Sequence, residues 1–185
     1  MKISSQEEYG LRCLIRLAEA DQQAHSVTIP EIAASERLSA PYVAKLLAVL
    51  RHAGIIESAR GRAGGYRLAT APGSVTLGTV LMALGEPLFE ETGYCERHKG
   101  SDGDGPCVHL GSCNLRAVWH TLETWMRRAF DQITLADLLQ GEGHITELLR
   151  KRLAEAAHEP ADFVPLTLLT KAPALQTAGA EAKKD

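Results

Sequence analysis

The chain has 185 residues, 45% of them apolar and 23% charged, with a formal net charge of −3. This length is enough for one ordinary domain or for a compact domain with an appended segment, and the composition is normal for a soluble protein. No run of eighteen apolar residues occurs, and the first thirty residues lack the pattern of a signal peptide, which argues against a transmembrane helix and a secreted protein. We therefore expect no membrane association and a cytoplasmic location.

The charges are unevenly distributed along the chain. Residues 38–70 hold five basic side chains against one acid, Glu57, whereas the chain from Thr76 onward holds sixteen acids against eleven bases. A basic segment in an otherwise acidic chain is typical of a nucleic-acid-binding surface. The basic residues of the segment are Lys45, Arg51, Arg60, Arg62 and Arg67.

The first predicted helix spans residues 4–20. Ser4 or Ser5 can cap it, and Glu7 and Glu8 stand in its first turn, near the positive end of the helix dipole. Apolar residues recur at helical spacing, and Cys13 is among them. We interpret Cys13 as a buried thiol of the core, because a free cysteine packs like a small hydrophobe.

Two further helices follow closely, in "TIPEIAASERL" and "SAPYVAKLLAVLRHAG". In the second, Ser39 is a good N-cap, Pro41 suits the first turn and Gly54 suits the end. Two short helices separated by a few residues have the spacing of a helix-turn-helix.

Two short strands, "IIESA" and "YRLAT", flank the glycine-rich basic segment "RGRAGG" at residues 60–65. Glycines permit the tight reversal of a hairpin. Three helices followed by a basic hairpin form the pattern of a winged helix-turn-helix, so the predicted fold class is mainly α with a small β-wing. Another short helix follows, ending near Gly85.

The segment from about 90 to 113 reads as an irregular, glycine-containing loop that holds Cys95, Cys107 and Cys113. In a reducing cytosol, clustered cysteines are more often metal ligands or redox groups than structural disulfides. Eleven residues separate the first pair and five the second, and structural zinc sites favour closer pairs. A zinc-stabilised module and a thiol switch between Cys107 and Cys113 remain alternatives.

A wide apolar stripe follows the loop at steps of three and four residues, which predicts a helix of about eighteen residues, near 114–131. So large a face exceeds what the rest of a small domain can cover, and we interpret it as a seam between two subunits, with an intramolecular core as the alternative. The seam residues are Leu115, Val118, Trp119, Leu122, Trp125 and Met126. A short helical turn in "ITLADLL" and a possible helix in "HITELLRKRLAEAA" follow, and we expect the tail from Pro160 to be mostly disordered.

With "EYGLR", "APYVAKLLAVLRHAGIIESARGRAGGYRLA", the three-cysteine loop and "ITLADLL" in this order, residues 1–140 resemble the Rrf2 family. The resemblance implies a bacterial winged-helix transcription regulator, of a kind that often carries an iron–sulfur cluster. It also implies a homodimer joined by the long helix. We therefore expect the chain to divide into three segments: a DNA-binding domain at 1–75, the cysteine loop with the dimerisation helix at 76–140, and a C-terminal extension at 141–185.

The resemblance also implies a ligand set of Cys95, Cys107, Cys113 and Glu8. One branch of the family has a ligating histidine three residues after the last cysteine, where this chain has Arg116. The nitric-oxide-sensing branch has an acidic ligand from the partner subunit just before the Tyr-Gly-Leu-Arg stretch, where this chain has Glu8. Glu8 has an alternative role as an ordinary first-turn acid. Iron–sulfur clusters tolerate wide cysteine spacing, and a [4Fe–4S] cluster is favoured over [2Fe–2S]. The histidines His98, His109 and His120 are alternative ligands.

On double-stranded DNA, the N-terminal part of helix 40–53 is expected to enter the major groove of a pseudo-palindromic operator. Arg60 and Arg62 of the wing suit an A·T-rich minor groove. We expect a repressor that is released by nitric oxide, oxidation or iron shortage. No phosphate-binding loop or catalytic triad is present, so an enzyme or electron carrier is the minor alternative. The residues expected to contact DNA from the helix are Ser39, Ala40, Tyr42 and Lys45.

Overall fold

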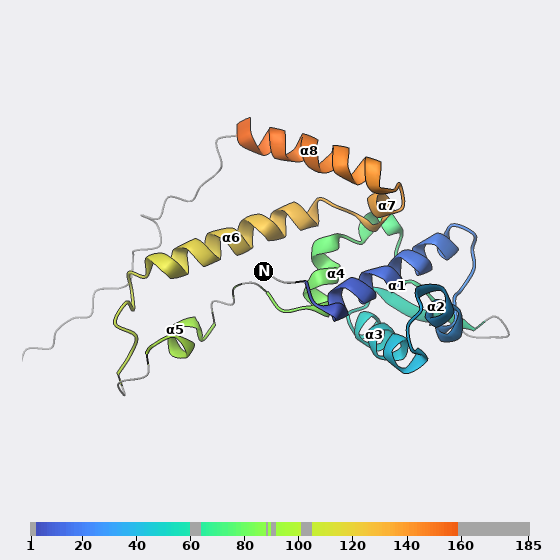
Figure 1. Ribbon diagram of the computed structural model, residues 1–185, viewed down its shortest axis with the longest axis horizontal. Coiled ribbons are helices and arrows are strands. Elements are labelled where there is room, and N and C mark those ends of the chain that lie inside the picture. The colour runs from blue at the N-terminus through green and yellow to red at the C-terminus, as the bar shows by residue number, and fades with distance from the viewer. Residues whose placement is uncertain (1–2, 60–63, 88, 90–91, 101–104, 159–185) are drawn as a thin grey trace, which may run out of the picture.

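The computed structural model describes residues 3–59, 64–87, 89, 92–100 and 105–158. In chain order the elements are α1 (Ser5–Asp21), α2 (Ile29–Glu36), α3 (Ala40–His52), β1 (Ile56–Ala59), β2 (Gly65–Leu68), the 3₁₀ turn η1 (Pro72–Ser74), α4 (Leu77–Leu84), α5 (Tyr94–Arg97), α6 (Asn114–Asp131), α7 (Leu135–Leu138) and α8 (Glu142–His158). Helices around one two-stranded antiparallel sheet confirm the predicted fold class (Figure 1).

Side-chain caps start the first two helices. Ser4 accepts a hydrogen bond from the backbone N–H of Glu7, whose carboxylate accepts one from the N–H of Ser4 at 2.7 Å. Thr28 and Glu31 form the same reciprocal pair at α2. Each reciprocal pair is a capping box, which satisfies two backbone N–H donors that have no partner inside the helix. These residues therefore fix where the two helices begin.

The core lies where α1, α3 and α4 meet, with α2 packed across one end. α3 contributes Val43, Leu46, Leu47 and Leu50, all with no exposed surface. Cys13 of α1 lies in the same cluster and is also fully buried, as predicted. The left-handed backbone of Arg37 turns the chain from α2 into α3, which completes the predicted helix-turn-helix.

The wing strands pair with Ile56 opposite Leu68 and Ala59 opposite Gly65. Val27, from the connection before α2, adds a bridge to Tyr66 through two backbone hydrogen bonds of 3.0 and 2.8 Å. A Cβ atom on Gly65 would lie 2.7 Å from the carbonyl oxygen of Val27, so only glycine permits this close approach.

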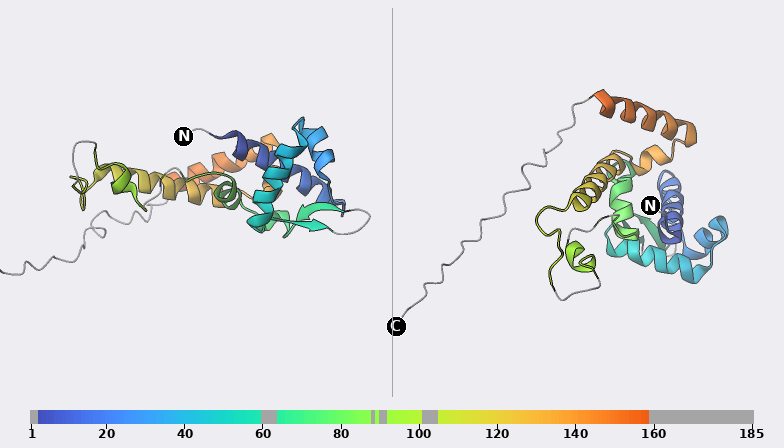
Figure 2. Two further views of the ribbon diagram at one scale, coloured as in Figure 1. Left: turned by 90° about the horizontal axis from the view of Figure 1, so that it is seen from below. Right: turned by 60° about the vertical axis from the view of Figure 1, so that its left-hand side comes forward.

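The long helix α6 projects from this domain, and its C-terminal end is fastened to the start of α4. The N–H of Leu77 donates to the carbonyl of Ile133 at 2.7 Å, and the N–H of Leu135 donates to the carbonyl of Val75 at 2.8 Å. The other end of α6 lies away from the core, beside α5 (Figures 1 and 2).

Two elements refine the expectations. The loop before α6 contains the one-turn helix α5, where we expected irregular chain. The centroid of the Tyr94 ring lies 5.0 Å from that of Phe89 and 4.4 Å from that of His98, and these contacts stabilise the turn.

The possible helix after Gly141 forms as α8, which packs against α7. The tail from Pro160 lies outside the described residues. Within the described parts of the chain, no helix combines the length and apolar character needed to cross a membrane.

Candidate functional site

The start of α3 presents the side chains expected to contact DNA. Ser39, Ala40 and Lys45 are exposed, and Tyr42 is half-buried. The Ser39 hydroxyl accepts from the backbone N–H of Tyr42 at 3.4 Å, so this side chain also caps the helix. The ring of Tyr42 meets Tyr9 edge-on, with centroids 6.1 Å apart, so α1 positions the side of α3 that would face a major groove.

Two of the three wing arginines, Arg60 and Arg62, lie outside the described residues. The third, Arg67, stands opposite Glu57 in the sheet, and its Nη2 lies 2.6 Å from the Glu57 carboxylate. The one acid of the basic segment therefore partly neutralises one of its five bases. Both groups are exposed, so the pair stabilises the wing only slightly.

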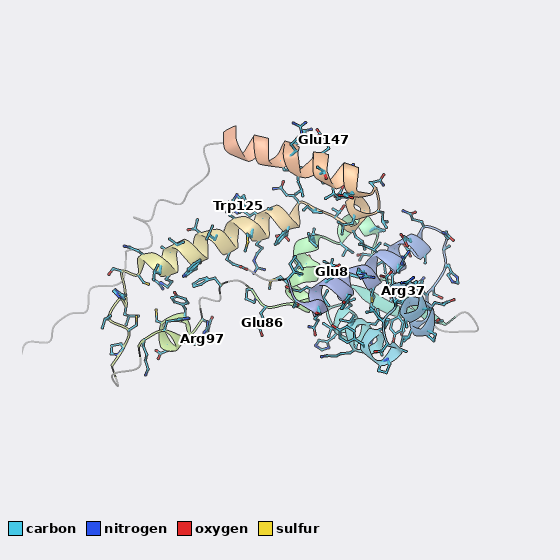
Figure 3. All side chains as sticks on the ribbon, viewed as in Figure 1. Glu8, Arg37, Glu86, Arg97, Trp125 and Glu147 are labelled. Atoms are coloured by element: carbon cyan, nitrogen blue, oxygen red, sulfur yellow. The ribbon has the colours of Figure 1, made fainter. Side chains whose placement is uncertain are left out.

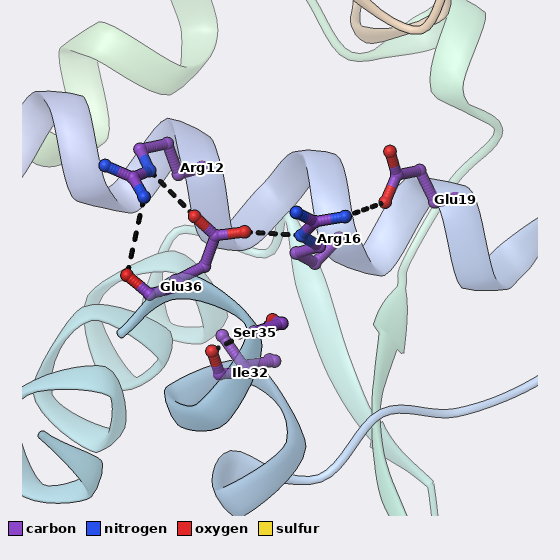
Figure 4. A network of polar contacts seen from close by, with 6 residues as sticks. All are labelled: Arg12, Arg16, Glu19, Ile32, Ser35 and Glu36. Carbon is purple, nitrogen blue, oxygen red and sulfur yellow. Dashed lines mark hydrogen bonds and ion pairs between the residues drawn. The ribbon is translucent and has the colours of Figure 1, made fainter. Parts of the chain in front are cut away.

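An ion cluster around one buried carboxylate, which was not predicted from the sequence, joins α1 to α2 (Figure 4). Glu36, the last residue of α2, has a side chain only 6% exposed and accepts from Arg12 Nε at 2.7 Å and from Arg16 Nε. Burial raises the pKa of Glu36, but hydrogen bonds from Arg16 and Arg12 outweigh it, so this pKa lies below its ordinary value. The sequence did contain a signal for this cluster, because Glu36 is one turn after the buried Ile32 and the two arginines are one turn apart on α1.

The three loop cysteines occupy different local structures. Cys95 lies in α5, Cys107 lies in the turn after it, and Cys113 is the N-cap of α6, where its Sγ accepts from the N–H of Arg116 at 3.4 Å. All three are half-buried free thiols, whereas burial raises the pKa of Cys13 to about 11. Accessible thiols are the ones able to bind metal or to be oxidised.

Within the described residues, no three His, Cys, Asp or Glu side chains lie close enough together to hold a metal ion. The chain by itself therefore does not gather Cys95, Cys107, Cys113 and Glu8. Their chemistry still suits an iron–sulfur cluster, because three unpaired, accessible thiols supply the soft ligands that iron–sulfur clusters take. His98 stacks on Tyr94, and His120 meets Phe89 edge-on at 6.1 Å, so both histidines contact aromatic rings.

Glu8, labelled on α1 in Figure 3, is exposed. It lines a groove of about 800 Å³ between α1, α4 and the C-terminal half of α6. The groove has an apolar lining, and its acids include Glu7, which caps α1, and Glu123, whose carboxylate lies 2.7 Å from Arg127. Glu8 is thus an exposed acid among the residues that line this groove. The apolar lining comes from Ile3, Leu11, Leu77, Leu81, Met82, Ala83, Leu84, Pro87, Met126 and Phe130.

The apolar stripe of α6 is not covered by the described part of the chain. Not one of the eighteen residues of α6 is buried, and Leu115 and Trp125 are 62% and 53% exposed. Figure 3 shows Trp125 projecting from α6 on the side of α8. Val118, Trp119 and Leu122 are exposed as well, at 48%, 40% and 42%. Of the six seam residues, only Met126, where the stripe meets the groove, is half-buried.

Comparison with known proteins places these features in a family. The family described as Rrf2, iron-dependent transcriptional regulator, matches residues 3–141. The transcriptional regulator NsrR of Geobacillus kaustophilus is 33% identical over 152 residues, which cover 82% of this chain and 99% of that protein. The solved structure of T. potens IscR is 29% identical with a TM-score of 0.58, covering 76% of this chain and 87% of that one. CymR, the global cysteine regulator of B. subtilis, is 28% identical with a TM-score of 0.56, covering 76% and 97%.

Proposed function

Because this chain belongs to the Rrf2 family of transcription regulators, we propose that it is a homodimeric repressor whose affinity for DNA depends on an iron–sulfur cluster. Family membership excludes the enzyme alternative. The observation that carries the proposal is the layout of α6. The helix begins at Cys113, which follows the loop that holds the free thiols of Cys95 and Cys107. It ends at the groove of Glu8 and exposes an apolar stripe between its two ends.

The exposed stripe supports a dimer. Five large side chains that are 40–62% exposed on one helix form a larger apolar surface than scattered exposed residues would. Packing two copies of α6 together would bury most of it, and the leucine and tryptophan side chains would stabilise the pair by about 1.5–3 kcal/mol each where burial is complete.

An antiparallel pair fits the layout best. A two-fold axis at Leu122 places the partner's Val118 opposite Met126 and brings the start of the partner's α6 towards the end of this one. Each cysteine loop then approaches the other subunit's groove, where Glu8 lies. The two DNA-binding units come to opposite ends of a helix pair about 27 Å long, which suits half-sites about 34 Å apart.

We assign Cys95, Cys107 and Cys113 of one subunit and Glu8 of the other as the residues that would hold the cluster, with [4Fe–4S] favoured. When bound, the cluster supplies an iron site that nitric oxide or oxygen can attack. Glu8 is an oxygen donor among thiolates, and we expect it to be the ligand most readily lost.

The path from the cluster to DNA runs through α1. Glu8 lies one turn before Arg12, which binds Glu36 of α2, and Tyr9 contacts Tyr42 of the recognition helix. A Glu8 that is bound to the partner holds α1, and through these contacts holds α2 and α3 at a fixed separation from their symmetry mates. Release of Glu8 shifts the population away from the DNA-competent dimer.

The test is an anaerobic absorption spectrum with iron and sulfide content, measured for the wild type and for Glu8→Ala. The proposal expects a coloured protein, about four irons per chain for a [4Fe–4S] cluster, and faster cluster loss in Glu8→Ala. Glu7→Ala is the matched control. It removes the neighbouring carboxylate, which caps α1 through Ser4, and therefore shows how much cluster loss comes from a weakened start of α1. A wild type that stays colourless and iron-free after reconstitution would overturn the cluster assignment.

A cluster-free thiol switch is the second candidate. It is favoured by the likeness to CymR, a cysteine regulator. It is also favoured by three free thiols that, within the described residues, do not belong to any group of side chains able to hold a metal ion. Its test is the mass of the air-oxidised protein. A Cys107–Cys113 disulfide that changes DNA affinity in the absence of iron would favour this mechanism.

A further inference from the structure

The tip of the cysteine loop exposes two apolar side chains next to a proposed ligand. Val108 is 88% exposed and Leu110 is 62% exposed, and a hydrogen bond of 2.9 Å from the N–H of Leu110 to the carbonyl of Cys107 closes the turn that presents them. Water contact with both side chains is unfavourable, so burial of this tip would stabilise whatever assembly provides it.

The groove beside Glu8 has matching apolar surface that is also exposed. Ile3 and Met82 are 63% and 52% exposed, and Leu11, Leu81 and Phe130 line the space between them. A volume of about 800 Å³ is ample for two aliphatic side chains. Met126 belongs both to this lining and to the α6 stripe, so the groove continues the surface that we assign to the dimer.

The tip does not reach the groove of its own chain. Cys113 is the N-cap of α6, whereas the groove begins at Glu123 and Met126, about 15–20 Å further along the helix at 1.5 Å per residue. Figure 1 shows α5 beside the N-terminal half of α6, and α1 and α4 at the opposite end. A second copy is therefore the occupant that fits.

We propose that Val108 and Leu110 of each subunit dock in the α1–α4–α6 groove of the other, against Ile3 and Met82. This inference rests on the proposed antiparallel dimer and goes beyond it, because the apolar contact requires no metal. The docked tip would bring Cys107 to the partner's Glu8 in advance, so the ligand set is assembled before a cluster is loaded.

The location of the tip is tested by photo-cross-linking in the full-length, metal-free protein. Leu110 is replaced by p-benzoylphenylalanine, and chains labelled with ¹⁴N and ¹⁵N are mixed and allowed to exchange. We expect cross-linked peptides of mixed label that contain Ile3 or Met82. Cross-links confined to one label, or to other parts of the surface, would overturn the inference.

The energetic contact is tested by a double-mutant cycle on dimer dissociation. Leu110→Ser and Met82→Ser should each raise the dissociation constant at least fivefold, and together by less than the product, because they remove the same contact. Lys99→Ser, on the exposed part of the same loop, should leave the constant unchanged. Independent, multiplicative effects, or no effect, would contradict docking.

Sedimentation of the wild type and of the variants distinguishes a failure of the proposed dimer from a failure of the docked loop tip. A wild type that is monomeric at micromolar concentration contradicts the proposed dimer and this inference together. A dimer that tolerates Leu110→Ser and Met82→Ser contradicts the docked tip alone, and leaves the α6 seam standing.

Discussion

Arg12 Nε donates a hydrogen bond to Glu36 Oε2 over 2.7 Å, and this contact joins α1 to the last residue of α2. Arg16 binds the other oxygen of the same carboxylate. Two guanidinium groups thus compensate a carboxylate that is nearly removed from water, as buried charge requires. The helix-turn-helix is thereby fixed against the helix that carries Glu8.

Glu36→Gln should lower the free energy of unfolding by about 1.5–3 kcal/mol, the range for hydrogen bonds to charged groups. Both arginines remain partly solvated after the change, which keeps the effect below that of a fully buried pair. Urea unfolding measures it. Glu19→Gln is the control, because its exposed pair with Arg16 should contribute less than about 0.5 kcal/mol. Equal stability of the two variants would contradict this role of Glu36.

The contribution of Glu36 should also depend on pH. Its pKa in the folded protein lies below the ordinary value of 4.5, so its stabilising effect is complete above that value and is lost as the pH falls through the folded pKa. The stability difference between the wild type and Glu36→Gln should stay constant from pH 7 to 5 and shrink below about pH 4.5. A difference that persists unchanged to pH 3 would show that the charge of Glu36 is not the cause.

Gly10→Ala should destabilise the fold, although glycine to alanine within a helix ordinarily gains about 1 kcal/mol. A Cβ atom at Gly10 would lie 2.7 Å from Cδ2 of Leu84, which is only 2% exposed, so Leu84 would have to shift. We expect a net loss of about 1–2 kcal/mol in thermal or urea unfolding. Gly73→Ala, where nothing lies within 4 Å of the added atom, should be close to neutral.

Cys13 should be protected from thiol reagents in the folded protein. Burial removes its surface and raises its pKa to about 11, so little thiolate forms at pH 8. Alkylation of the metal-free protein by iodoacetamide, followed by mass spectrometry, should label Cys95, Cys107 and Cys113 and leave Cys13 unmodified until urea is added. Labelling of all four at similar rates would contradict the buried position.

Lys45→Ala should weaken binding to all DNA sequences by a similar factor, because we expect the exposed lysine at the start of α3 to contact a phosphate and not a base. For a dimer, two lost phosphate contacts should reduce the slope of log affinity against log salt by about 1.8. Lys99→Ala, in the cysteine loop, should leave the slope unchanged. A loss restricted to one operator sequence would instead indicate that Lys45 contacts a base.

Local signals in the sequence predicted most of the fold. The cap at Ser39, the core positions of α3 and the stripe of α6 follow from periodicity and capping chemistry, and α6 has the bounds expected. The ion cluster at Glu36 and the groove at Glu8 depend on how α1 meets α2, α4 and α6, and the spacing within each helix does not determine those contacts. The same holds for the cysteines, because the proposed ligand set is split between two chains.

The most direct test of the central claim compares DNA affinity with and without the cluster. A fragment is selected from genomic DNA by the anaerobically purified protein, and its affinity is then measured for the loaded protein, for the metal-free protein and for the loaded protein after exposure to nitric oxide. We expect the loaded dimer to bind the fragment at least tenfold more tightly than the metal-free and nitric-oxide-treated forms do. Equal affinities for all three forms would contradict control by an iron–sulfur cluster.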